Sequence, residues 1–158
     1  MLARANAPST DAGTVEVVSR LYRVVAFIER RLTGVYGELG LKHGEVDVLN
    51  ALLSGGKESD SPTNVAAALM CSTGAMTNRL DRLEKAGYLR REHGTEDRRS
   101  ILLSITPEGK KLTKRANVAR EAISGELLPA LSTTERKAMV GMLRRMLTDF
   151  EATAGEDE

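Results

Sequence analysis

A short helix–turn–helix pattern followed at once by a hairpin is the feature that most constrains how this chain can fold. Ser61–Pro62 predicts a helix start, because Ser can cap free N–H groups and Pro suits the first helical position. After a tight turn, a second helix is expected to run to Lys85, with Gly87 as its stop. Tyr88–Glu92 and Ser100–Ile105 then predict two strands joined by a polar tip.

Apolar residues at three- and four-residue steps predict longer helices on both sides of this motif. The expected helices before it cover about 15–39 and 42–53, and those after it cover about 106–128 and 133–150. Aromatic residues make up 3% of the chain and Trp is absent, so the core must be built from aliphatic residues and Met. This composition favours helices. The predicted fold class is therefore mainly α, with a small β-hairpin.

The second helix of the motif has two different faces. Met76, Leu80 and Leu83 share one face and are expected to pack inward, whereas short polar residues such as Thr77 and Asn78 lie around the other side. Thr, Asn and Arg side chains offer hydrogen bonds that suit base edges in the major groove of DNA. A plain surface helix could carry the same residues, so this face alone leaves both interpretations open.

The hairpin adds weight to the interpretation as a DNA-binding motif. Its tip contains Glu96-Asp97-Arg98-Arg99, and an arginine on a thin projection can enter the narrow minor groove, where negative potential is concentrated. An adjacent acid can hold the guanidinium in position. From Ser72 to Arg115 there are eleven Lys or Arg against six Asp or Glu, as expected of a phosphate-binding surface. On the strands, Ile101, Leu103 and Ile105 are expected to face inward.

Two stretches of the chain resemble the MarR family of regulators. Residues 72–91 resemble the family's recognition helix and first wing strand. Residues 97–100, followed by residues 104–109, resemble its wing and the start of the next helix. The resemblance spans about Val15 to Phe150 and implies a winged helix-turn-helix fold. It also implies the residues that contact DNA. From the helix these are Ser72, Thr73, Thr77, Asn78 and Arg79, and from the wing Arg99, oriented by Asp97, with Arg98 as a candidate for phosphate contacts.

The same resemblance implies a homodimer and a division of the chain. Residues 1–13 are expected to form a disordered tail, 14–150 a single MarR-type domain, and 151–158 an acidic tail. Within the domain, the helices in 14–40 and 107–150 would form the dimerisation region, and 42–106 the winged-helix DNA-binding lobe. The apolar stripes on the first and last helices agree, because they are too apolar to stay exposed to water. The implied function is a repressor on a pseudo-palindromic operator in double-stranded DNA.

Release by a small organic molecule, phenolic or anionic, is a further implication of the resemblance. His43 and Asp47 lie one helical turn apart on the second helix, in the region where the family binds such effectors. Arg20 and Tyr22 on the first helix are expected to approach them. The alternative is that Asp47 forms a structural ion pair, since many ionisable pairs are structural.

The single cysteine, Cys71, falls in the turn of the helix–turn–helix, and a small buried apolar role is expected for it. Redox sensing is the alternative. The two histidines, His43 and His93, are far apart in the sequence and no Cys/His cluster exists, so neither a metal nor another cofactor is expected.

The sequence patterns typical of enzymes are missing. There is no Gly-rich phosphate loop, nucleophile elbow or catalytic His/carboxylate spacing, and we do not expect an enzyme. A dimeric protein-interaction module of the same fold, without specific DNA binding, is the alternative function. No run of residues is long and apolar enough to cross a membrane, and Met1–Gly13 lacks the apolar stretch of a signal peptide. A cytoplasmic location is therefore expected.

Overall fold

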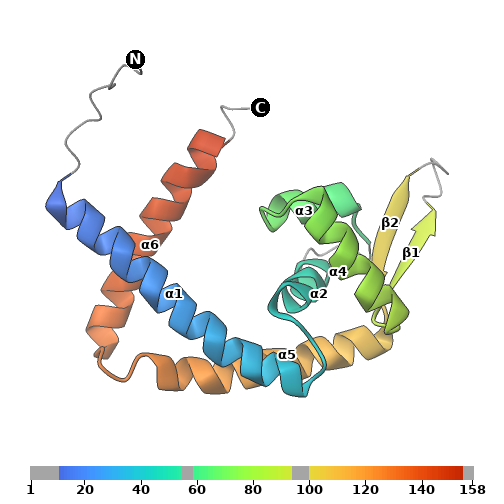
Figure 1. Ribbon diagram of the computed structural model, residues 1–158, viewed down its shortest axis with the longest axis horizontal. Coiled ribbons are helices and arrows are strands. Elements are labelled where there is room, and N and C mark those ends of the chain that lie inside the picture. Colours follow the sequence, from blue (N-terminus) through green and yellow to red (C-terminus); the bar gives the residue numbers. More distant parts are fainter. Residues whose placement is uncertain (1–10, 55–58, 94–99, 155–158) are drawn as a thin grey trace, which may run out of the picture. The chain divides into compact units, whose positions relative to one another are not determined.

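A computed structural model describes residues 11–54, 59–93 and 100–154. The chain forms two compact units, residues 1–123 and 124–158, and each is described by itself. Figure 1 labels the elements in chain order. They are α1 Ala12–Glu38, α2 His43–Ser54, α3 Pro62–Ala68, α4 Thr73–Lys85, β1 Leu89–His93, β2 Ile101–Ile105, α5 Pro107–Leu127 and α6 Thr133–Ala154. The predicted class, mainly α with a small β-hairpin, is confirmed for the described residues.

The boundaries differ from the sequence prediction by a few residues. Helix α1 begins at Ala12, so the end of the expected N-terminal tail is helical, and α6 continues to Ala154 instead of ending at Phe150. Helix ends carry weak signals, because the last turns depend on capping and not on the apolar repeat. Residues 1–10 and 155–158 of the predicted tails lie outside the described residues.

The helix–turn–helix forms where its capping residues predict it. Ser61 caps α3 by accepting a hydrogen bond from the Asn64 N–H at 3.1 Å, with Pro62 as the first helical residue. Ser72 caps α4 in the same way, through the Ala75 N–H at 3.4 Å. Gly87, with φ +77°, ends the turn after α4, a conformation that favours glycine.

The turn between α3 and α4 lies at the surface. Met70 adopts a positive φ of 46° and is 91% exposed. Cys71 is half-buried, so the expectation of a buried apolar role is only partly met. The reason is that a tight turn between two short helices has no further element to cover it.

The core of the first unit is aliphatic and is built around α2. Met76, Leu80 and Leu83 of α4 are at most 2% exposed, which confirms the predicted inward face. The other buried apolar residues of this core come from α1, the α1–α2 turn, α2, α3, the strands and α5: Leu32, Tyr36, Leu41, Val46, Val48, Leu49, Leu52, Val65, Leu89, Leu103, Leu112, Ala116 and Ile123. Close packing of these side chains fixes α4 as a rigid helix with one face in the core and one face in water.

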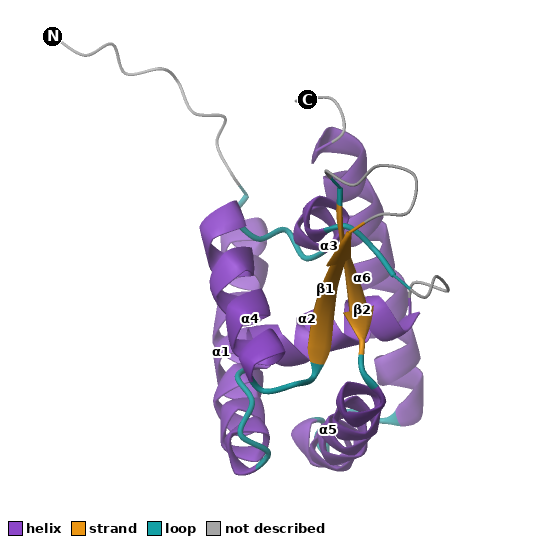
Figure 2. Cartoon of the chain, turned by 90° about the vertical axis from the view of Figure 1, so that its right-hand side faces the viewer, coloured by secondary structure: helices purple, strands orange, loops and turns teal. Residues whose placement is uncertain are grey.

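The two strands form an antiparallel hairpin, shown side by side in Figure 2. Leu89 pairs with Ile105 and Arg91 with Leu103. Asp60, just before α3, adds a short bridge to Leu103 through two backbone hydrogen bonds of 3.1 and 2.7 Å. The middle of β2 is thereby tied to the start of the helix–turn–helix.

The predicted inward face of the second strand is only partly correct. Leu103 is fully buried, whereas Ile105 is half-buried and Ile101 is 42% exposed. Leu103 lies at the level of the helical core, and Ile101 lies further along the hairpin, beyond the helices that could cover it. Alternation along a strand predicts which side chains share a face, but not how far that face is covered.

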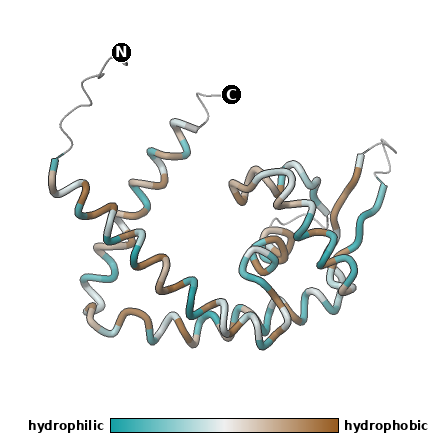
Figure 3. The backbone as a smooth tube through the Cα atoms, viewed as in Figure 1, coloured by the Kyte–Doolittle hydropathy of each residue, from teal (hydrophilic) through white to brown (hydrophobic). Residues whose placement is uncertain are grey.

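Helices α1 and α6 each carry large apolar side chains that the single chain leaves exposed. Figure 3 shows brown, hydrophobic stretches along both helices. On α1 the exposed apolar residues are Val15, Val17, Val18, Tyr22, Val24, Val25 and Phe27. On α6 they are Met139, Val140, Met142, Leu143, Leu147 and Phe150. No helix among the described residues has the length and hydropathy needed to span a membrane.

Candidate nucleic-acid interface

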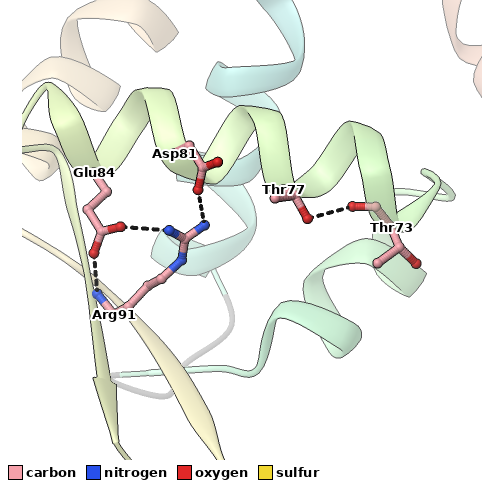
Figure 4. A network of polar contacts seen from close by, with 5 residues as sticks. All are labelled: Thr73, Thr77, Asp81, Glu84 and Arg91. Carbon is pink, nitrogen blue, oxygen red and sulfur yellow. Dashed lines mark hydrogen bonds and ion pairs between the residues drawn. The ribbon is translucent and has the colours of Figure 1, made fainter.

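The outer face of α4 presents short polar side chains to water. Ser72, Thr73, Thr77 and Asn78, four of the residues expected to contact DNA, are exposed. The Thr77 hydroxyl donates a hydrogen bond of 2.9 Å to the Thr73 carbonyl oxygen, which fixes the direction of its free lone pairs. Figure 4 shows this contact near the N-terminal end of α4. Side chains of this size allow a close approach of the helix backbone to another surface.

Arg79, the fifth predicted DNA contact on α4, lies on the side of the helix that faces α2. It is half-buried, and its guanidinium covers Gly44 so closely that a methyl group at position 44 would overlap it. Its side chain forms no hydrogen bond or ion pair with the residues that the structure describes. Arg79 is thus separate from the exposed polar face and occupies the flank of α4.

An ion pair with a buried carboxylate joins α4 to α2 next to Arg79. Arg82 Nε lies 2.6 Å from Glu45 Oε1, and Glu45 is only 3% exposed. The other carboxylate oxygen accepts a hydrogen bond of 2.8 Å from the Lys42 backbone N–H at the start of α2. Sequence analysis did not single out Glu45, because an acid in the first turn of a helix is usually a surface residue.

Two cavities open on either side of this ion pair. One, of about 310 Å³, is lined by Lys42, His43, Gly44, Glu45, Asn78, Arg79 and Arg82. The other, of about 220 Å³, is lined by Gly40, Leu41, Glu45, Arg82, Leu83, Lys85, Ala86 and Tyr88. The larger cavity has three cationic side chains and one carboxylate, so its lining is electropositive.

The opposite flank of α4 is held to the hairpin by Arg91 of β1. Its Nη2 lies 2.6 Å from Asp81 Oδ1, and its Nη1 lies 2.7 Å from Glu84 Oε2 (Figure 4). The Arg91 backbone N–H also donates to Glu84 Oε1 at 3.3 Å. Burial alone would lower the pKa of Arg91, but the two carboxylates outweigh it and raise that pKa above its usual value. This network was not predicted from the sequence.

The tip of the hairpin, with the predicted residues Asp97, Arg98 and Arg99, lies outside the described residues. The structure does describe the base of the hairpin. The Thr106 hydroxyl donates to the Gly87 carbonyl oxygen at 2.8 Å and accepts from the Gly109 N–H at 3.0 Å. A side chain on Gly109 would collide with the backbone oxygen of Tyr88. The end of α4, the start of β1 and the start of α5 are therefore tightly joined.

The predicted effector residues separate into two groups. His43 Nε2 lies 3.8 Å from Asp47 Oδ1, and the ring centroids of His43 and Tyr36 are 5.7 Å apart. Burial raises the pKa of the Tyr36 hydroxyl, Arg120 lowers it and Asp47 raises it. Tyr36 and Arg120 thus belong with His43 and Asp47 in one polar cluster between α1, α2 and α5. Neither Tyr36 nor Arg120 carries a sequence signal that predicts this position.

The other two predicted effector residues do not approach this cluster within one chain. Arg20 pairs with Glu16 on its own helix at 2.5 Å, and Tyr22 is 75% exposed. Tyr22 precedes Tyr36 in the same continuous helix, and 14 residues correspond to roughly 21 Å of helix. Within one chain, the length of α1 therefore separates Arg20 and Tyr22 from the polar cluster, and their role as effector contacts stays a prediction.

Within residues 11–54, 59–93 and 100–154, no group of three or more His, Cys, Asp or Glu side chains is arranged to hold a metal ion.

Comparison with known proteins gives consistent matches. The sequence profile of the MarR family matches residues 59–101. The HTH-type transcriptional regulator PecS of Dickeya dadantii (strain 3937) is 35% identical to the chain over 142 residues, which cover 88% of this chain and 84% of PecS.

Two solved structures have a similar fold. A cysteine-to-serine mutant of MarR from E. coli, complexed with operator DNA, has a TM-score of 0.77 at 20% identity and covers 87% of this chain and 99% of its own. Bordetella bronchiseptica BpsR, whose DNA binding is regulated by 6-hydroxynicotinic acid, has a TM-score of 0.66 at 24% identity and covers 80% of this chain and 98% of its own. At these identities the likeness establishes the winged-helix fold alone.

Proposed function

Because this chain belongs to the MarR family of DNA-binding transcriptional regulators, we propose that it acts as a homodimeric repressor on a pseudo-palindromic operator. It is a regulator and not an enzyme. The observation that carries the proposal is the exposed polar face of α4, supported from behind by a fully buried apolar face. A helix about 10–12 Å in diameter fits the major groove, which is about 12 Å wide.

In this proposal, Ser72, Thr73, Thr77 and Asn78 meet the DNA from α4. Hydroxyl and amide groups can bind base edges or phosphates, and the cap at Ser72 leaves the other N–H groups of the first turn directed outward. The wing contributes Arg99, oriented by Asp97, with Arg98 near phosphates. Support comes from the MarR of E. coli, which has the same fold and was solved with operator DNA.

Dimerisation is proposed through α1 and α6. Each helix exposes a row of large apolar side chains, and rows of this size are rarely left in water by a stable monomer. A two-fold axis would place two α4 helices in successive major grooves, about 34 Å apart. A pseudo-palindromic operator then follows from the symmetry of the protein.

A small phenolic or anionic molecule is proposed to release the DNA. The polar cluster of Tyr36, His43, Asp47 and Arg120 lies where α1 and α5 meet α2. A ligand there would contact α1 and α5 of the proposed dimerisation region together with α2 of the DNA-binding lobe. The regulation of BpsR by 6-hydroxynicotinic acid supports a ligand of this class. Since the operator is chromosomal DNA, we propose that the protein acts in the cytoplasm.

The proposal is tested by selection in vitro. The purified protein is incubated with fragmented genomic DNA at low salt, with the Arg99→Ala variant in parallel. The expected result is an enriched inverted repeat, with binding weakened by about 1–3 kcal/mol in the variant. Light scattering on the same sample gives the oligomeric state. If the folded protein enriched no sequence, specific DNA binding would be excluded, and the alternative of a dimeric protein-interaction module would take its place.

A further inference from the structure

The larger cavity between α2 and α4 is positively charged, and its cationic side chains are not among the proposed contacts to DNA bases. Lys42 of α2 and Arg79 of α4 both line it, and neither side chain has an ion pair or hydrogen bond with the part of the chain that the structure describes. The third cation, Arg82, is already paired with Glu45 at 2.6 Å. Since Arg82 already neutralises the Glu45 carboxylate of the lining, the positive charges of Lys42 and Arg79 remain in the cavity.

The position of the cavity relative to α4 indicates what would fill it. Glu84 and Asp81 bind Arg91 on the flank that faces the hairpin, while Arg79 and Arg82 contact α2 on the other flank. The exposed residue Asn78 lies between the two flanks and also reaches the rim of the cavity. The cavity thus borders the polar face of α4 on the side away from the hairpin.

A helix in the major groove has a phosphate strand along each of its flanks. On the flank of α4 that faces the hairpin, the proposed wing contacts bind one of these two DNA strands. On the α2 flank, the nearest cationic groups are the side chains of Lys42 and Arg79. Two cationic side chains that have no partner among the described residues would attract a phosphate to this place.

We propose that the α2–α4 cavity is an oxyanion site for a backbone phosphate of the DNA strand opposite the wing, held by Lys42 and Arg79. This inference rests on the proposed function and extends it, because it adds a residue outside the helix–turn–helix and the wing to the DNA contacts. Gly44 has a role in the site. Without a side chain at position 44, the Arg79 guanidinium can lie against α2 beside Lys42.

The test measures affinity for an operator duplex and for a non-operator duplex over a series of salt concentrations. The variants are Lys42→Gln and Arg79→Gln, and Lys137→Gln on α6 is the matched control. Lys42 is exposed, so its replacement leaves the fold intact. Each cavity variant is expected to bind both duplexes about two- to fivefold more weakly. The slope of log K against log salt should become shallower by about 0.9 for each lost phosphate contact, and the control should change neither quantity.

Gly44→Ala provides a second variant that keeps every charge. The new methyl group displaces the Arg79 guanidinium. The DNA affinity of Gly44→Ala should therefore fall as far as that of Arg79→Gln. The double variant Gly44→Ala/Arg79→Gln should bind DNA no more weakly than either single variant.

Three outcomes would contradict the proposal in different ways. Unchanged affinity and slope in the folded variants would overturn the phosphate site, while operator binding by the unmodified protein would leave the proposed function standing. A loss confined to the operator duplex would overturn it too, because a phosphate contact carries no sequence information. A separate experiment titrates inorganic phosphate into the protein without DNA and follows the backbone amide NMR shifts. If the NMR shifts change at the cavity while the Lys42→Gln and Arg79→Gln variants keep their DNA affinity, the cavity binds a free anion and not a DNA phosphate. Absence of operator binding by the unmodified protein would defeat the proposed function itself.

Discussion

Arg82 of α4 and Glu45 of α2 form an ion pair of 2.6 Å in which the carboxylate is buried and the guanidinium side chain is half-exposed. The pair ties the DNA-facing helix to the central helix of the first unit. Glu45 is buried, whereas the Arg82 side chain is about half exposed to water. A buried charged group that loses its partner lowers the free energy of unfolding more than an exposed one does. This inequality leads to a measurable asymmetry between two substitutions.

Arg82→Gln should destabilise the protein more than Glu45→Gln. After Arg82→Gln, the buried carboxylate keeps the Lys42 N–H as its one partner among the described residues, and we expect the free energy of unfolding to fall by about 1–2 kcal/mol. After Glu45→Gln, Arg82 can turn into water and the loss should be about half as large. Urea denaturation of both variants and of the double variant measures the difference. Equal losses for the two single variants would show that the burial of Glu45 has no energetic consequence.

Gly109→Ala should disrupt the junction between α4, β1 and α5. The new methyl group would collide with the Tyr88 carbonyl oxygen, which is backbone and cannot rotate away. Overpacking of this kind typically costs about 1–3 kcal/mol. Gly125→Ala on the same helix is the matched control, because nothing lies within 4 Å of its added carbon. Thermal unfolding should show a lower Tm for the first variant only. A Tm as high as the control's would mean that the junction can shift.

The helix–turn–helix could be predicted because its signals are local. Ser61 and Ser72 cap the helices that follow them, Gly87 ends one, and Met76, Leu80 and Leu83 recur at helical steps. Each of these signals lies within a few residues of the structure it specifies. The strands were found by the same local reasoning, although the exposure of Ile101 was not, because exposure depends on what packs above a strand.

The contacts that fix α4 to its neighbours could not be predicted. Glu45 and Arg82 are 37 positions apart, and Arg91 meets Asp81 only because the hairpin folds back along the helix. Neither pair leaves a periodic trace in the sequence. Within one chain, Arg20 and Tyr22 are not grouped with His43, because the middle of a long helix lies far from its end. Short-range patterns determine the elements, whereas tertiary pairing determines the site.

The stability of the protein should depend on Tyr36 at alkaline pH. Burial raises the pKa of the Tyr36 hydroxyl above its ordinary value of 10.0, so the folded state holds this proton more tightly than the unfolded state. The contribution of Tyr36 to the free energy of unfolding is therefore fully present below about pH 10. It is lost as the pH rises through the pKa that Tyr36 has in the folded state. Tyr36→Phe should make the fall of the unfolding free energy above pH 10 less steep than in the unmodified protein. Parallel curves for the two proteins would contradict a raised pKa.

Arg91 should act on DNA binding through the position of the hairpin. Its guanidinium binds Asp81 and Glu84 together, which holds β1 against α4 and neutralises two carboxylates beside the DNA-facing surface. Arg91→Ala is expected to lower operator affinity about tenfold and the unfolding free energy by no more than about 1 kcal/mol, since these partners are partly exposed. Lys has a single ammonium group and cannot bind both carboxylates in a planar fork, so Arg91→Lys should restore stability more fully than affinity.

The distinguishing measurement for Arg91 is a double variant. If repulsion from the freed carboxylate caused the loss, adding Asp81→Asn to Arg91→Ala would restore operator affinity. If instead the hairpin loses its orientation, the double variant stays as weak as Arg91→Ala, and removing the wing contact by Arg99→Ala costs little more in that background, because coupled contacts are not additive. We expect the second result, since the Arg91 backbone N–H also bonds to Glu84 and joins the strand itself to the helix. Full additivity of Arg91→Ala and Arg99→Ala would separate Arg91 from the wing.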